Sequence, residues 1–420
     1  MWRLLDTFTR ATLRPRSAGV NAENGLVQVR LIDDNEPVAT PPLLKRLNEE
    51  AVLDTIRAGA PISRAEIARR AGISKPTVSL ALRALLEAGI VREAPSGPAG
   101  PTYGATYFEP VAEASLVLGV DLGARFLRGA LTDLAGTVRA RQDVELAGAD
   151  ADTALDAIAR LRDALVGAAG LSSDLIDEVV VGVPGVVEPA TGVVRLATNI
   201  AGLDGRAYGA ELEERLGTRV TLENDVNLAA LGERRQGVAR GVEDFMFLSI
   251  GTGLGAGLVL RGELQRGRNG AAGELDYVAA GIEHEIDPCA AALASYAARV
   301  AARDGDSTSL APPYDARSVF VAARMGDRLA RDVVREEARR IALHIAPIAA
   351  VADVELVVLG GGIGTNSELL SDVRRLIDVW LPYPPRVEIS SLGENAVLMG
   401  AVAIGLHSAL DAVFVSRRGT

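Results

Sequence analysis

The chain has 420 residues, of which 48% are hydrophobic and 24% charged, and its formal net charge at pH 7 is −11. This composition excludes wholesale disorder, and the length exceeds what one hydrophobic core usually supports, so two or three domains are expected. The single cysteine, Cys289, excludes an intrachain disulfide. No apolar core follows the N-terminus, and the most apolar run, residues 344–363, contains a proline and two acidic residues. We therefore expect no secretory signal and no membrane span, and predict a cytoplasmic protein.

The charge is distributed unevenly along the chain. Residues 41–92 contain nine lysines and arginines against five acidic residues, a net charge of +4, whereas residues 111–420 carry a net charge of −13. A basic module on an acidic body is the distribution that nucleic-acid binding through one end requires. Ordinary variation among helix surfaces would also account for a charge of +4, so the charge alone does not decide.

Residues 1–40 show no sustained period and are predicted to be a loose N-terminal extension without an assigned function. The rest of the chain is predicted to divide into two domains, residues 41–109 and residues 110–420. The change at residue 41 is marked by a pair of prolines, and the change near residue 110 by a short hinge.

The 41–109 domain begins with a helical pattern. Apolar spacing predicts a first helix over residues 43–59. Ser63 and Glu66 form a capping-box pattern that opens a second helix, and Ser74 is the predicted N-cap of a third helix over residues 75–88. Three short helices with a glycine-containing turn before the third are typical of a helix-turn-helix.

The third helix is the predicted DNA-reading element, and a returning strand over residues 103–108 would make the domain a winged form. Its core-facing residues are expected to be Val78, Leu82 and Leu85. Its exposed face carries the hydroxyls and cations that contact base edges and phosphates in a major groove, namely Ser74, Lys75, Thr77, Ser79 and Arg83. A three-helix protein-interaction module is the alternative. The predicted wing tip, residues 97–101, carries no cation, so we expect it to add little phosphate contact.

Strands and helices alternate after residue 110, which predicts an α/β architecture with mixed sheets. A meander of three strands is expected at 116–121, 125–132 and 137–146. Further strands are expected at 178–183, 192–196, 220–222, 245–250, 355–359 and 387–389, and helices at 151–167, 208–216, 288–303, 315–324, 327–351, 366–379 and 396–409.

The most informative stretch is residues 222–277. A strand delivers Asn224 and Asp225 to the start of a helix, and a second strand runs into glycines at alternate positions over 251–257. Glycines so placed let backbone N–H groups turn toward one electron-rich ligand, although they also serve tight hairpins. With Glu274 after them, three polar functions are expected to converge on one cleft.

These pieces resemble the ROK family of repressors and sugar kinases, as do residues 118–123, 181–185 and 357–363. The resemblance covers residues 41–412. It implies an actin/hexokinase-like fold, two α/β lobes around a cleft, here preceded by the winged helix-turn-helix. It also implies sugar contacts at Asn199, Asn224, Asp225 and Glu274, and phosphate-loop-like positions at Asp121, Gly123, Gly251, Thr252, Gly253 and Gly255.

In kinases of this family the aspartate matching Asp225 accepts a proton from a sugar hydroxyl; the alternative is a helix N-cap with structural duty only. Three positions depart from the family pattern. Arg125 stands where the first phosphate loop has a hydroxyl, Tyr277 stands in place of a histidine, and Cys289 alone remains of three zinc-binding cysteines. Because a structural zinc needs four such ligands, we expect neither a metal nor another cofactor.

The sequence therefore predicts a DNA-binding transcriptional regulator of sugar-related genes, a repressor with a kinase-derived sensing domain. A homodimer or higher homo-oligomer is expected, since two-fold operators need paired recognition helices. The expected partners are double-stranded operator DNA and a sugar-type effector. The alternatives are an ATP-dependent sugar kinase with Asp225 as its base and a regulatory head, and a constitutive regulator with an empty pocket.

Overall fold

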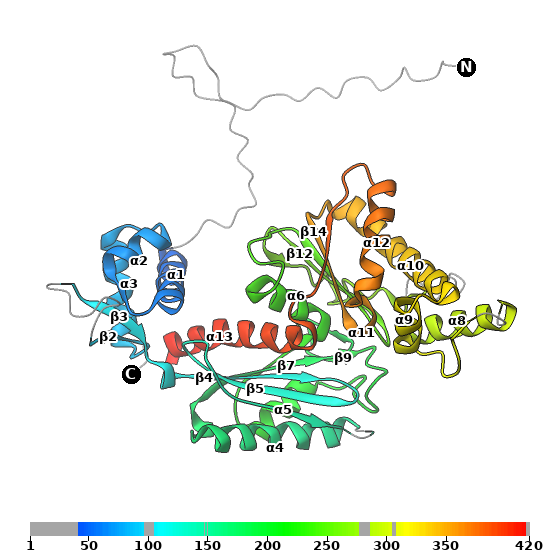
Figure 1. Cartoon of the computed structure of the whole chain (residues 1–420). Coiled ribbons are helices and arrows are strands. Elements are labelled where there is room, and N and C mark those ends of the chain that lie inside the picture. Colours follow the sequence, from blue (N-terminus) through cyan, green and yellow to red (C-terminus); the bar gives the residue numbers. More distant parts are fainter. Residues whose placement is uncertain are drawn as a thin grey trace, which may run out of the picture. The chain divides into compact units, whose positions relative to one another are not determined.

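The computed structural model describes residues 41–95, 105–146, 148, 150–276, 286–304 and 308–416 (Figure 1). The predicted N-terminal extension, the wing tip and Tyr277 lie outside the described residues.

The head contains the three predicted helices and a small antiparallel sheet. Its elements are α1 (Pro41–Gly59), β1 (Ile62–Ser63), α2 (Arg64–Ala71), α3 (Lys75–Glu87), β2 (Val91–Ala94) and β3 (Tyr107–Pro110). The two predicted N-caps are confirmed, because the hydroxyl of Ser63 accepts from the Glu66 N–H and that of Ser74 from the Thr77 N–H, both at 3.4 Å. Strand β1, which was not predicted, pairs Ile62 with Phe108 of β3 and closes the sheet in the order β1-β3-β2.

The head has a hydrophobic core, to which α1, α2 and α3 each contribute. The three residues predicted to face inward on α3, Val78, Leu82 and Leu85, are buried. They pack in one cluster with Leu53 of α1 and Ile67 of α2. Burying a side chain of this size contributes about 1.5–3 kcal/mol, so this cluster holds α3 in place and leaves its other face to solvent.

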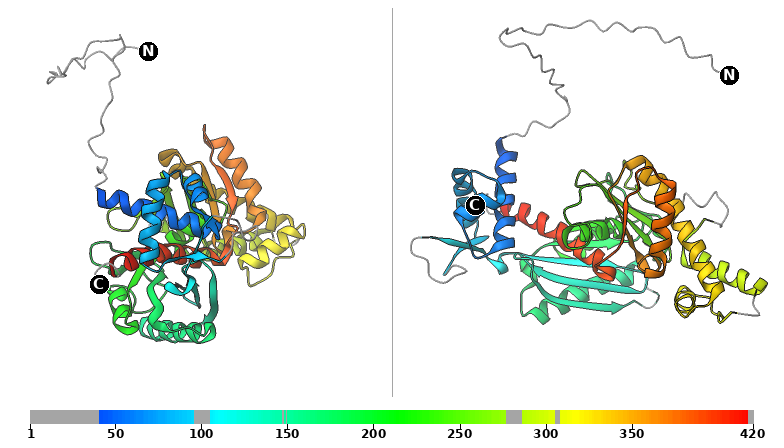
Figure 2. Two further views of the ribbon diagram at one scale, coloured as in Figure 1. Left: turned by 90° about the vertical axis from the view of Figure 1, so that its left-hand side faces the viewer. Right: turned by 45° about the horizontal axis from the view of Figure 1, so that its top comes forward.

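The first lobe is a five-stranded mixed sheet with the strand order β10-β7-β4-β5-β6. Its strands are β4 (Leu116–Leu122), β5 (Phe126–Asp133), β6 (Val138–Glu145), β7 (Ile176–Val183) and β10 (Val220–Asn224). The helices α4 (Ala151–Ala169) and α5 (Tyr208–Leu216) cover one face. The last helix, α13 (Ala396–Ser416), packs on β4 and β7 from the other face (Figure 1, Figure 2). The predicted meander is confirmed.

The second lobe repeats this arrangement. Its strands are β11 (Phe245–Ile250), β12 (Leu254–Leu260), β13 (Glu263–Leu264), β14 (Leu356–Gly360) and β15 (Arg386–Ile389), in the order β13-β12-β11-β14-β15. In each lobe an antiparallel meander of three strands is extended by two parallel strands beside its first strand. Strands β4 and β11 are therefore equivalent, and each runs into a hairpin turn. This is the predicted two-lobed fold.

Helices complete the second lobe. They are α6 (Asp225–Gln236), α8 (Ala290–Asp304), α9 (Ala316–Arg324), α10 (Arg328–Ala352), the single turn α11 (Gly361–Gly364) and α12 (Ser367–Trp380). The last five share one large apolar cluster with the sheet, while α6 packs on its opposite face. Strand β9 (Val194–Arg195) lies within the predicted strand 192–196 and is shorter than predicted; it forms a short hairpin with β8 (Val186–Val187), which was not predicted. None of the described helices combines the length and the hydropathy needed to cross a membrane.

The glycine-rich run is a β-hairpin. Residues 251–253 form its turn, whereas Gly255 and Gly257 lie within β12. A Cβ on Gly257 would stand 2.8 Å from the Cβ of Ala230 and 2.9 Å from the carbonyl oxygen of Val226, both in α6. The glycines of the strand thus let α6 pack directly on β12. The hairpin alternative is confirmed, because residues 254–259 pair with β11, whereas a role of the glycines in ligand binding stays a prediction.

Candidate functional site

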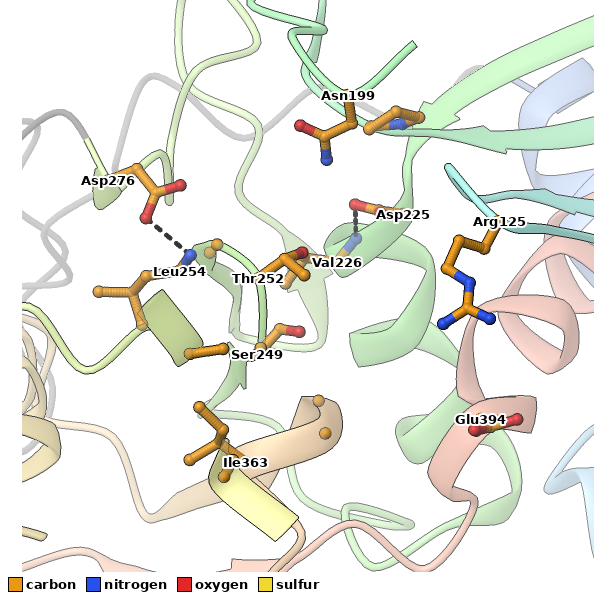
Figure 3. Close-up of a pocket in the computed structure, with 18 of the residues that line it drawn as sticks. Arg125, Asn199, Asp225, Val226, Ser249, Thr252, Leu254, Asp276, Ile363 and Glu394 are labelled. Carbon is orange, nitrogen blue, oxygen red and sulfur yellow. Dashed lines mark hydrogen bonds between the residues drawn. The ribbon is translucent and has the colours of Figure 1, made fainter. Parts of the chain in front are cut away.

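A cavity of about 850 Å³ is lined by residues at the ends of strands from both lobes (Figure 3). Eight of the predicted ligand and phosphate-loop residues line it: Asn199, Asn224, Asp225, Gly251, Thr252, Gly253, Gly255 and Glu274. Asp121 and Gly123 are not among the lining residues. The sequence therefore located the cavity, and the individual roles of these residues stay predictions.

The junction of β10 with α6 places Asn224 and Asp225. Asn224 is the N-cap of α6, because its Oδ1 accepts from the Asn227 N–H at 3.0 Å. Its Nδ2 donates to the carbonyl oxygen of Gly185 at 2.9 Å. The capping duty considered for Asp225 thus belongs to Asn224. Asp225 is the first residue of the helix, and its Oδ1 accepts from the Val226 N–H at 2.8 Å (Figure 3).

The electrostatic surroundings of Asp225 favour its protonated form. Burial raises the pKa of this carboxyl to about 7, and the negative charges of Asp121 and Glu274 act in the same direction. Both protonation states of this carboxyl are therefore accessible near neutral pH. It can therefore donate a hydrogen bond to a hydroxyl oxygen as well as accept one from a hydroxyl proton.

Glu223, which the sequence analysis did not identify, stabilises the junction of β10 with α6 through hydrogen bonds. Its Oε1 accepts from the Asn224 N–H and from Nδ2 of Asn227, both at 3.0 Å. Its Oε2 accepts from Nε of Arg266 at 2.6 Å, in an ion pair between the two lobes. A carboxylate at the buried end of a strand, directly before two polar residues, is the sequence signal that could have identified it.

The segment after β13 brings Glu274 and Asp276 to the cavity. The Ala256 N–H donates to the carbonyl oxygen of Gly273 at 2.9 Å, and a Cβ on Gly273 would stand 1.8 Å from the Ala256 carbonyl oxygen. Oδ1 of Asp276 accepts from the Leu254 N–H at 2.7 Å and so fixes the start of β12. Burial raises the pKa of both carboxyls, and the Asp276 charge adds to the shift at Glu274.

In the first phosphate loop, Asp121 takes part in an ion pair that the sequence did not predict. Asp121 is buried at the end of β4, and its Oδ2 accepts from Nη1 of Arg128 at 3.2 Å. Nη2 of Arg128 donates to Glu394 at 2.9 Å, so one arginine joins the two carboxylates. Burial raises the pKa of Asp121 to about 6 even though Arg128 lowers it. Arg125, rather than Asp121, lines the cavity (Figure 3).

The described part of the cavity lining is acidic overall. Its cations are Arg125 and Arg317, the second of which lies on α9 and was not predicted. Its acidic residues are Asp225, Glu274, Asp276 and Glu394. Such a lining favours hydroxyl groups, which hydrogen-bond to carboxylates, over a polyanion without accompanying cations.

No group of three His, Cys, Asp or Glu side chains that could hold a metal occurs among the described residues. The thiol of Cys289 donates to Oδ1 of Asp276 at 3.6 Å, and burial raises its pKa. His284 and Tyr277 lie outside the described residues. The absence of zinc therefore remains a prediction.

On the head, four of the five predicted DNA contacts have partners within the protein. The hydroxyls of Ser74 and Thr77 lie 2.7 Å apart within the cap. The hydroxyl of Ser79 donates to the Lys75 carbonyl oxygen, and Arg83 pairs with Glu87 at 2.8 Å. The ammonium group of Lys75 makes no hydrogen bond or ion pair with the described part of the chain.

Comparisons with known proteins cover both parts of the chain. The ROK family model matches residues 117–407, and a winged helix-turn-helix DNA-binding model matches residues 46–92. The xylose repressor of Caldicellulosiruptor bescii is 26% identical over 390 residues, which cover 88% of this chain and 98% of that protein. The glucokinase of Halalkalibacterium halodurans is 30% identical over 312 residues, covering 67% of this chain and 92% of the enzyme.

Solved structures also include both a regulator that matches most of this chain and a kinase that matches a smaller share of it. A ROK family transcriptional regulator, described as a homolog of the E. coli MLC protein, has a TM-score of 0.74 at 23% identity and covers 89% of this chain and 98% of its own. A ROK family glucokinase from Streptomyces griseus, in complex with glucose and AMPPNP, has a TM-score of 0.58 at 27% identity, covering 69% and 99%. The family model spans well over half of the chain, and so this protein belongs to the ROK family.

Proposed function

We propose that this protein is a DNA-binding transcriptional regulator, a repressor of sugar-related genes, whose sensing domain derives from a sugar kinase. The observation that carries this proposal is the extent of the match to the xylose repressor, which includes the head and nearly all of that protein. The match to a glucokinase spans a smaller share of this chain and nearly all of the enzyme. A DNA-binding head before a kinase-like body is what separates the two groups.

The head supports DNA binding through the exposed face of α3. Its hydrophobic cluster fixes the helix on one side, and Lys75 and Arg83 extend from the other side. A helix held this way can enter a major groove, where arginine and lysine contact phosphates and guanine. Because operators of such regulators have two half-sites, we propose that the protein acts as a homodimer or a higher homo-oligomer.

The cavity supports recognition of a small polyhydroxy effector. Asn199, Asp225 and Glu274 line it, and Asp225 with a pKa of about 7 can exchange hydrogen bonds with a hydroxyl in either direction. An effector that binds one arrangement of the lobes better than another shifts the population toward that arrangement. We propose that this shift changes the affinity of the heads for DNA.

We propose that the domain does not phosphorylate sugars. Asp121 is engaged by Arg128, Arg125 occupies part of the cavity lining, and the lining carries an excess of carboxylates. Correct positioning of two reactants is worth roughly 7–11 kcal/mol of the barrier, so a loosely held sugar or nucleotide would lose most of the rate even with a base in place. The similarity to glucokinases keeps the kinase as the second candidate.

The test is the selection of DNA duplexes from a random pool by the full-length protein, followed by binding measurements at one fixed salt concentration. We expect an inverted-repeat sequence to be enriched and its affinity to change on addition of one sugar from a panel of pentoses, hexoses and amino sugars. Failure to enrich any sequence would contradict the DNA-binding function. Enrichment without an effect of any sugar would favour the constitutive regulator.

A further inference from the structure

Leu80 is an apolar side chain in an unusual place. It lies in the middle of α3 and is 70% exposed. Three and four positions along a helix share one face, so Leu80 lies beside Pro76, Thr77 and Arg83. Pro76 is exposed as well, and the two residues form an apolar ridge on the face where polar side chains were predicted.

The hydroxyl groups next to this ridge already make hydrogen bonds within the protein. The hydroxyl of Ser79 donates to the carbonyl oxygen of Lys75 at 2.9 Å and accepts from Nη1 of Arg64 at 3.3 Å. Those of Ser74 and Thr77 bond to each other at 2.7 Å. Short hydroxyls held in this way are poor readers of base edges unless they give up these bonds. Leu80 has no such bond to give up.

Building on the proposed DNA binding, we propose that Leu80 is a specificity-determining residue that contacts the C5-methyl group of a thymine in each half-site. Leucine carries no donor or acceptor on its side chain, so it cannot read the hydrogen-bonding edge of any base. The thymine methyl is the apolar group that base pairs present in the major groove. Contact between the two apolar groups removes both from water, which favours thymine over the other bases at that position.

The test uses the duplex that the full-length protein enriches from a random pool. Each thymine is replaced singly by deoxyuridine, which removes the methyl group and keeps the base pair. We expect the wild-type protein to lose about 3–10-fold in affinity at one thymine per half-site, in line with the loss of about one buried methyl group and its contacts. Leu80→Ala should bind the thymine duplex more weakly by a similar factor and should show no further loss with uracil at that position.

Two control variants separate the possible results. Lys75→Ala should weaken binding to the thymine and uracil duplexes equally, so that the dependence on the methyl group persists. Val351→Ala truncates another exposed apolar residue, 88% exposed at the end of α10, and should bind both duplexes as the wild type does.

These measurements distinguish failure of the proposed Leu80–thymine contact from failure of the proposed DNA binding. If Leu80→Ala binds like the wild type while Lys75→Ala binds more weakly, DNA binding stands and the assignment of Leu80 is wrong. The assignment is also wrong if Leu80→Ala binds weakly but keeps the full sensitivity to uracil, a result that a contact with a protein partner or the sugar-phosphate backbone would give. If the wild type enriches no sequence, the proposed function and this contact fall together.

Discussion

At the scale of single residues, Lys75 and Arg83 are the predicted cations of the DNA interface. Each replacement by alanine should weaken binding to the selected duplex by about 1–3 kcal/mol, and loss of a phosphate contact should reduce the dependence of affinity on salt by about one ion. The effect of Arg83→Ala should be the smaller one, because Arg83 must first leave Glu87. Fluorescence anisotropy titrations at several salt concentrations would measure both quantities.

Arg335→Ala removes an exposed arginine of α10 and is the matched control, expected to bind like the wild type. Unchanged affinity in Lys75→Ala and Arg83→Ala, with folding intact by circular dichroism, would favour the protein-interaction module over a DNA-binding head.

The second prediction at this scale concerns Asp225 and pH. Its raised pKa means that the folded protein holds this proton to a higher pH than the unfolded chain does. Its contribution to the free energy of unfolding therefore falls as the pH rises from roughly 4, the ordinary aspartate pKa, to about 7. Asp225→Asn removes this titration. The Tm of the variant minus the Tm of the wild type should therefore be more positive at pH 8 than at pH 5.

Thermal unfolding at the two pH values measures this difference, with Asp378→Asn on the exposed face of α12 as the control. A difference in Tm for Asp225→Asn that is equal at both pH values would show that burial does not perturb this carboxyl as described.

At the scale of secondary-structure elements, the glycines of β12 set the distance between the strand and α6. Gly257→Ala should destabilise the protein by about 1–3 kcal/mol, because the new methyl group would meet the backbone of α6 at 2.9 Å. Gly167→Ala is the matched control with the opposite expected sign. Gly167 lies in the exposed part of α4 with nothing within 4 Å of an added Cβ, so alanine should stabilise the helix by about 0.5–1 kcal/mol. Urea unfolding of both variants provides the comparison.

The same scale shows where sequence reasoning succeeds. Apolar patterns predicted most strands and helices of the two lobes. Strand β12, with its alternating glycines, was not predicted, and β6 was predicted although it is largely exposed. Strands β1 and β8, of two residues each, carry no detectable period and exist only through pairing with β3 and β9. The identity of the N-cap residue of α6 could not be predicted from the sequence for a different reason. Whether Asn224 or Asp225 occupies the cap depends on the residue at which β10 ends, which tertiary packing decides.

Much of the cavity was also predictable, since residues that end neighbouring strands meet at one edge. Asp121 is the exception. Its engagement by Arg128 joins positions seven residues apart on antiparallel strands, and the further bond to Glu394 spans most of the chain. Arg317 reaches the cavity from α9, far from the recognised motifs, and its local sequence gave no signal.

At the scale of the whole molecule, the first prediction concerns metal. Purified protein should contain no stoichiometric zinc, because Cys289 is the only cysteine and its thiol is bonded to Asp276. Elemental analysis after dialysis against a chelator measures the metal content. About one zinc per chain would contradict the prediction and would point to ligands that include Cys289, which Cys289→Ser would test.

The second prediction for the whole molecule concerns catalysis. We expect no sugar phosphorylation above background in a coupled ADP-release assay with ATP and common hexoses, pentoses and amino sugars. Turnover near 1 per second, in the usual kinase range, that disappears in Asp225→Asn would establish the kinase instead. A sugar that raises the Tm without turnover would assign Asp225 to ligand binding, since a ligand that binds only the folded state stabilises it.

The return of α13 to the first lobe links the order of synthesis to the order of folding. Val402 and Ala401 of this helix cover Val117 of β4 and Val180 of β7, so one face of the first sheet is completed by residues that are synthesised after the second lobe. During translation, the face of β4 and β7 that α13 covers stays without this helix until the second lobe has been synthesised. A growing chain in this condition is a natural client for chaperones, and premature termination before residue 396 yields a polypeptide that exposes this face permanently.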